Sequence, residues 1–130
     1  MSVNHDLMRQ LIDRLIDDQR INGDTGGLNK LGADLVDAIK MHMETRSSQA
    51  ESNVYAARRA MAKALAEQGD KVSVETVKSF VDAIKNGYYI WDESPEEGGK
   101  SPRLRLATEE EQAAFKQRIT GGLSSGVVTR

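Results

Sequence analysis

Apolar residues recur at spacings of three and four along most of this chain, and that periodicity constrains the fold more than any other feature. Within 4–20 and again within 28–45, large aliphatic side chains fall on one face of a helix. The segment 22–27 between them contains three glycines, which favour a turn. We therefore expect residues 1–46 to form an antiparallel helical hairpin.

Capping signals and turn residues divide the second half of the chain. Ser48 with Glu51, and Thr108 with Glu111, have the capping-box spacing of a helix start. Ser73 is placed to cap a further helix. We expect helices over 48–68, 74–86 and 109–119, strands over 88–93 and 103–106, and glycines at 87 and at 121–122 that end the helices before them.

The expected fold is therefore mainly α with a small β-hairpin. A helical hairpin (1–46) precedes a helix-helix-β-hairpin segment (54–107) and a C-terminal helix (108–120). The length of 130 residues suits one domain, which we place at 1–122, with a loose tail at 123–130. The first ten residues lack the basic and apolar regions of a signal peptide. No apolar run is long enough to span a bilayer, so we expect a cytoplasmic protein without membrane contact.

Catalytic and metal-binding signatures are sparse in this sequence. The absence of cysteine excludes a disulfide framework, a Cys-ligated zinc site and a thiol nucleophile. Asp24-Thr25-Gly26 matches the short signature of aspartic proteases, but that chemistry needs two such carboxylates on loops after strands. His5 and His42 are the two histidines, and neither has a partner at metal-ligand spacing. We expect no enzyme, no cofactor and no metal.

The stretch 72–77, with Phe80, Ile84, Gly87 and the hairpin after it, resembles a winged helix-turn-helix over 54–107. The resemblance implies that helix 74–86 enters a DNA groove and that hairpin 88–107 is a wing touching phosphates. The implied contact residues on the helices and the hairpin are Arg58, Arg59, Lys63, Thr76, Lys78, Ser79, Lys85, Lys100, Arg103 and Arg105.

The distribution of charge weighs for and against this interpretation. Residues 54–107 hold nine basic and eight acidic residues, a net charge of +1, within a chain whose net charge is -2. The basic excess thus falls where DNA binding needs it. However, Glu75 and Asp82 on the helix, and Glu96 and Glu97 in the hairpin, would repel phosphates. Duplex DNA is accordingly one candidate partner.

A second hypothesis explains the same features without nucleic acid. The chain would be a helical protein-interaction or assembly subunit, an adaptor of the kind found among phage and plasmid accessory proteins. It would associate with a second copy through its N-terminal helices, or bind a partner protein through its apolar helix faces. Tyr89 and Trp91 share one face of the first strand, and this face is either an interface or is covered by a helix of the chain. The candidate interface residues are Leu11, Leu15, Leu35, Ile39, Tyr89 and Trp91.

Overall fold

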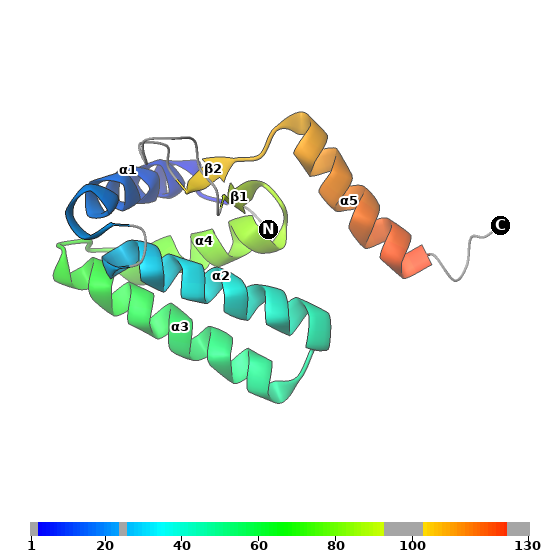
Figure 1. Cartoon of the computed structure of the whole chain (residues 1–130), viewed down its shortest axis with the longest axis horizontal. Coiled ribbons are helices and arrows are strands. Elements are labelled where there is room, and N and C mark those ends of the chain that lie inside the picture. The colour runs from blue at the N-terminus through cyan, green and yellow to red at the C-terminus, as the bar shows by residue number, and fades with distance from the viewer. Residues whose placement is uncertain (1–2, 24–25, 93–102, 125–130) are drawn as a thin grey trace.

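The computed structural model describes residues 3–23, 26–92 and 103–124. This part of the chain is mainly helical with one small antiparallel hairpin, as the sequence predicts (Figure 1). The elements in chain order are α1 (His5–Asn22), α2 (Gly27–Thr45), α3 (Ser48–Glu67), α4 (Ser73–Lys85), β1 (Tyr89–Trp91), β2 (Leu104–Leu106) and α5 (Glu109–Ser124).

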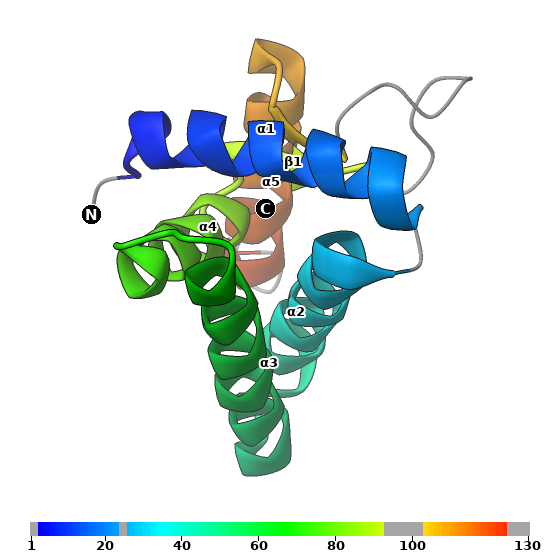
Figure 2. The ribbon, with the colours of Figure 1, turned by 90° about the vertical axis from the view of Figure 1, so that its left-hand side faces the viewer.

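The helices α2 and α3 form the long antiparallel pair at the centre of the fold. They diverge from their connection at 46–47, and α1 lies across their open end, as Figure 2 shows. The most extensive packing in the chain is between α2 and α3, and α4 packs along α3. The helix α1 therefore crosses α2 steeply and does not lie alongside it.

Side-chain hydrogen bonds fix the starts of α1 and α5. The side chain of Asn4 accepts from the backbone N–H of Leu7 at 3.1 Å and opens α1. At α5, the Thr108 hydroxyl accepts from the N–H of Glu111 at 3.1 Å, and the Glu111 carboxylate accepts from the N–H of Thr108 at 2.9 Å. This reciprocal pair is the capping box that the sequence predicts.

Two other predicted caps are wrong. Ser47 rather than Ser48 caps α3, since its hydroxyl accepts from the N–H of Ala50 at 3.1 Å. Ser73 is the first helical residue of α4, and its side chain makes no cap. No side chain caps α4; the Asp70 carboxylate instead braces the turn before it, accepting from the N–H of Val72 at 2.8 Å and from the Thr76 hydroxyl at 3.1 Å.

One continuous core fills the space between the helices and the hairpin. The large fully buried side chains include Met8, Leu28, Met61, Leu65 and Phe80. The six residues predicted to face a partner belong to this same core, and that prediction is wrong. The periodic faces of the helices turn toward one another within a single chain, and α1 and α2 cover the aromatic strand face. The six are Leu11, Leu15, Leu35, Ile39, Tyr89 and Trp91.

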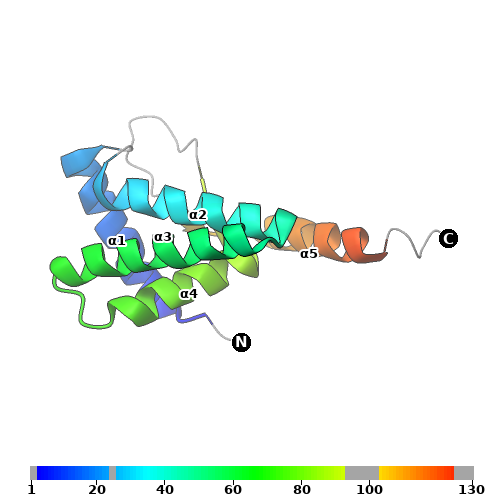
Figure 3. The same ribbon diagram turned by 90° about the horizontal axis from the view of Figure 1, so that it is seen from below.

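The hairpin pairs Tyr89 with Leu106 and Trp91 with Leu104. From it α5 extends away from the other helices, as Figures 1 and 3 show. The predicted end of this helix is wrong, because Gly121 and Gly122 lie within α5, which continues to Ser124. No helix in the described ranges is both long enough and apolar enough to cross a membrane.

Candidate functional site

Thr76 and Ser79 of α4 are implied to contact DNA, but both are buried, so this part of the prediction is wrong. Thr76 is 2% exposed, and its hydroxyl donates to Asp70 and to the Val72 carbonyl. Ser79 is 6% exposed, and its hydroxyl accepts from the backbone N–H of Asn4 at 2.9 Å. The start of α1 packs on this face of α4, which the periodicity of α4 alone does not reveal.

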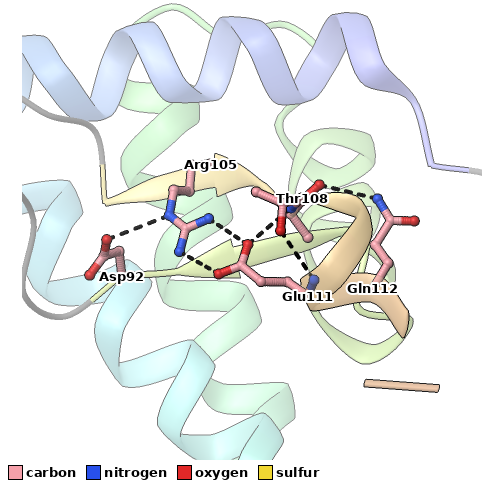
Figure 4. Close-up of polar contacts among 6 residues, drawn as sticks. Asp92, Arg105, Thr108, Glu111 and Gln112 are labelled. Carbon is pink, nitrogen blue, oxygen red and sulfur yellow. Dashed lines mark hydrogen bonds and ion pairs between the residues drawn. The ribbon is translucent and has the colours of Figure 1, made fainter. Parts of the chain in front are cut away.

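The hairpin arginines make contacts within the chain, and Figure 4 shows those of Arg105. Two guanidinium nitrogens of Arg105 donate to the two carboxylate oxygens of Glu111, each at 2.8 Å, and Nε reaches Asp92 at 3.5 Å. Arg103 donates to the Asp92 carbonyl at 3.2 Å. Lys100 lies outside the described residues. The wing that the resemblance implies thus directs its described arginines toward the hairpin and α5.

The Arg105–Glu111 pair also sets the protonation of both groups. The hydrogen bonds from Arg105, followed by that from the Thr108 N–H, lower the pKa of Glu111 to about 2. The hydrogen bond to Glu111 in turn raises the pKa of Arg105. Both side chains are about one-third exposed. This bidentate pair therefore connects β2 to the first turn of α5 and remains ionised at neutral pH.

The cations of α3 and α4 remain at the surface. Arg59, Lys63 and Lys78 are exposed, and they form no ion pair with another residue in 3–23, 26–92 or 103–124. The guanidinium of Arg58 lies over the ring of Tyr55, 5.7 Å from its centroid. Lys85 is half-buried and lines a separate hollow with His42 and Arg46. The cations predicted to contact DNA from α3 and α4 therefore do not form one cluster, because Lys85 lies in a hollow apart from the others.

A shallow groove of about 140 Å³ runs between α3 and α4 beside Arg58 and Arg59. We call it the α3–α4 groove. Its other lining residues are Tyr55, Ala62, Val74 and Val77. Tyr55 is 56% exposed and Val74 is 62% exposed, which is high for side chains of this size. The groove therefore combines open apolar surface with two arginines.

Sequence reasoning missed Tyr55 and Val74. Each is a large apolar residue directly beside, rather than on, the apolar stripe of its helix, next to Val54 in α3 and before Thr76 and Val77 in α4. A stripe predicts which residues enter the core. A large apolar residue next to the stripe is the sequence signal that could have indicated a second contact, on the outward side of the helix.

The described residues contain no group of three or more histidine or acidic side chains placed to hold a metal ion. No known protein family matches the chain, and no curated protein sequence or solved structure shows significant similarity to it.

Proposed function

We propose that this chain is a protein-binding module, an adaptor or assembly subunit without catalytic activity, whose α3–α4 groove receives an acidic amphipathic helix of a partner protein. The observation that carries the proposal is the exposure of Tyr55 and Val74 in one groove with Arg58 and Arg59. Exposed apolar side chains that gather together, rather than singly, mark interaction sites on soluble domains.

The groove has the size of an anchor pocket. Its volume of about 140 Å³ is close to the roughly 150 Å³ of an apolar cavity that holds one benzene ring. One leucine or aromatic side chain would therefore fill it and remove the floor, formed by Ala62 and Val77, from water. Interfaces commonly depend on a few such anchors in desolvated pockets.

The rim of the groove selects for an acidic partner. Arg58 and Arg59 line it, and Lys78 lies one helical turn from Val74 on the same face of α4. Glu75 follows Val74 and contributes one negative charge on the α4 side. The cations outnumber this acid, so a helix with an apolar stripe flanked by carboxylates complements the groove in both respects.

Duplex DNA is a second candidate, because Arg59, Lys63 and Lys78 carry charges that no described residue neutralises. Phosphate neutralisation by such cations provides sequence-independent affinity for duplexes. DNA binding would involve these cations but not the apolar floor of the groove. Lys63 separates the two functions, because it is exposed on α3 but does not line the groove.

The test uses a synthetic helical peptide with a leucine stripe flanked by glutamates, and the same peptide with lysines in their place. Fluorescence anisotropy should show saturable binding of the acidic peptide and much weaker binding of the basic one. Val74→Glu should weaken binding about tenfold or more. The matched control is Val72→Glu, since Val72 is 42% exposed but lies outside the groove, and it should leave binding within about twofold.

The same assay with a short mixed-sequence DNA duplex at low salt tests the second candidate. Duplex binding that falls with salt and weakens in Lys63→Glu, with no peptide binding, would overturn the protein-binding proposal in favour of DNA. Peptide binding that Lys63→Glu leaves unchanged and Arg58→Glu with Arg59→Glu abolishes would support it. If Val72→Glu and Val74→Glu change the affinity for the peptide equally, the groove is not the binding site.

A further inference from the structure

A second and larger cavity, of about 390 Å³, lies between α5 and the rest of the fold. We call it the α5 cavity. Its walls come from α2, the end of α4, β1 and the first half of α5. The residues on which the argument rests are Val36, Lys40, Ile84, Trp91, Ala114 and Phe115. None of them lines the α3–α4 groove, so this cavity is independent of the function proposed above.

The cavity exists because α5 is held to the fold at two points one helical turn apart. At the first point, Glu111 pairs with Arg105 in β2. At the second, the ring of Phe115 lies directly on Gly87, where a Cβ would be 2.5 Å from the ring. Gly87 also has a φ of +74°, so it is suited both to the close contact and to the turn. These contacts fix the first half of α5 beside α2 and β1 without filling the space between them.

We infer that the α5 cavity binds a small planar aromatic molecule that carries one anionic group. The first reason is volume, since small-molecule sites span roughly 300–1,000 Å³. At about 390 Å³, the cavity is more than twice the roughly 150 Å³ that accommodates a single benzene ring. It therefore has room for two linked or fused rings.

The second reason is the chemistry of the walls. Val36, Ile84 and Ala114 contribute aliphatic surface to the lining, and Trp91 of β1 and Phe115 of α5 contribute aromatic side chains. Aromatic pairs are favourable in offset-stacked or edge-to-face arrangements. A flat aromatic ligand between Trp91 and Phe115 would gain such contacts while it leaves water.

The charge that we infer for the ligand comes from the two charged residues on the wall, Lys40 and Glu111. Glu111 has both carboxylate oxygens bound by Arg105, so its charge is already compensated. Lys40 brings an ammonium group to the α2 side of the cavity, and an ammonium has three donors to share. A carboxylate or sulfonate on the ligand would accept one of them in a charge-assisted hydrogen bond.

The cavity contains its own reporter, because Trp91 is the one tryptophan of the sequence. The probe is 8-anilinonaphthalene-1-sulfonate, which has an aromatic body and an anionic group. It is titrated into the folded full chain, whose cooperative unfolding is verified first. We expect saturable binding of one probe per chain, with energy transfer from Trp91 to the probe.

Two substitutions at neighbouring positions test the location. Ala114→Phe fills the cavity and should weaken probe binding about tenfold. Ala113→Phe is the matched control, since Ala113 is also exposed on α5 but does not line the cavity. It should leave the affinity within about twofold. If Ala114→Phe does not fold, Ala114→Leu replaces it. Equal effects at both positions, or no saturable binding to the folded chain, would overturn the inference.

A third variant tests the charge. Lys40→Gln should weaken binding of the sulfonate probe several-fold and leave binding of its uncharged analogue, N-phenyl-1-naphthylamine, unchanged. If Lys40→Gln weakens the binding of both probes equally, or weakens the binding of neither, the anionic part of the inference is overturned.

Val74→Glu should not alter the affinity for either probe, because Val74 lies in the α3–α4 groove. A response to Val74→Glu would place the probe in the groove instead and would overturn the inference. Failure here leaves the peptide test above unaffected.

Discussion

The indole ring of Trp91 packs directly on the Cα of Gly32, in the interior of α2. A Cβ built on Gly32 would lie 2.7 Å from Cη2 and 3.0 Å from Cζ3 of the indole. The same indole is 6.0 Å from the ring of Phe80, measured between centroids. The sequence places a glycine within this helix at a cost to helix stability. The close approach of the β1 tryptophan explains the glycine at this position.

This contact makes the effect of Gly32→Ala opposite to what helix propensity predicts. Propensity alone predicts that alanine stabilises α2 by about 1 kcal/mol. We expect instead a loss of about 1–3 kcal/mol in the free energy of unfolding, because the methyl group overpacks the indole. Urea unfolding followed by circular dichroism measures the change. In a Trp91→Leu background the same substitution should become neutral or stabilising, and a stabilised Gly32→Ala single variant would contradict the contact.

The sequence predicts the helices well because their core-facing residues recur with a regular period. Each predicted helix exists, and most ends lie within a few residues of the prediction. Caps were less predictable where two candidates stood close together. Ser73 does not cap α4, and the Asp70 carboxylate before the helix binds the Val72 N–H and the Thr76 hydroxyl instead. Which groups a side chain can contact depends on the path of the turn, and local sequence spacing does not determine that path.

The surface was the least predictable part. Ser79 has the spacing of an outward residue but is covered by Asn4, which is far from it in sequence. Arg105 has the spacing of a wing residue but binds Glu111. In each case a tertiary contact, rather than the residue's own helix or strand, decides its exposure. The candidate sites therefore emerged only when the packing of α1, α4 and α5 was known.

The carboxylate of Asp18 caps α2 from outside that helix. It is 6% exposed and accepts from the N–H of Asn29 at 3.1 Å, from the Asn29 side chain at 3.2 Å and from the Asn22 side chain at 2.9 Å. The residue in the cap position of α2, Gly26, has no side chain to serve there. Asp18 therefore binds N–H groups that would otherwise be buried without partners.

Asp18→Ala should accordingly reduce the free energy of unfolding by about 2–3 kcal/mol, because it leaves buried donors of Asn29 unsatisfied. Chemical denaturation measures this loss. The neighbouring residue provides the control. Asp17 is largely exposed and pairs with Arg20 on the surface of α1, so Asp17→Ala should change stability by less than about 0.5 kcal/mol. Similar losses in the two variants would contradict the role of Asp18 as a cap.

The pKa of Glu111 predicts how the attachment of α5 depends on pH. Binding to Arg105 lowers this pKa from 4.5 to about 2 in the folded chain. A carboxyl with a lowered folded pKa stabilises the fold above its unfolded pKa, and this contribution declines as the pH falls toward the folded value. The contribution should therefore be complete above pH 4.5 and lost as the pH falls toward 2.

The measurement compares wild type with Glu111→Gln in urea unfolding at several pH values. Wild type should be the more stable at neutral pH, and the difference should shrink below pH 4.5 as Glu111 becomes protonated. The control is Glu110→Gln, at the exposed neighbouring position in the first turn of α5, where no comparable pH-dependent difference is expected. A difference between wild type and Glu111→Gln that is independent of pH would contradict the assignment.

The backbone conformation of Arg46, the first residue of the α2–α3 connection, predicts a stabilising substitution. Arg46 has φ of 55° and ψ of 23°, in the left-handed region, and its N–H donates to the His42 carbonyl at 2.8 Å. Glycine is the usual residue in this position, because side chains are strained there. Arg46→Gly should therefore raise the free energy of unfolding by about 0.5–1 kcal/mol. Thr45→Gly, one residue earlier and still within α2, should lower it by up to about 1 kcal/mol. Thermal and urea unfolding of the two variants should change in opposite directions, and destabilisation by both would show that Arg46 is not strained.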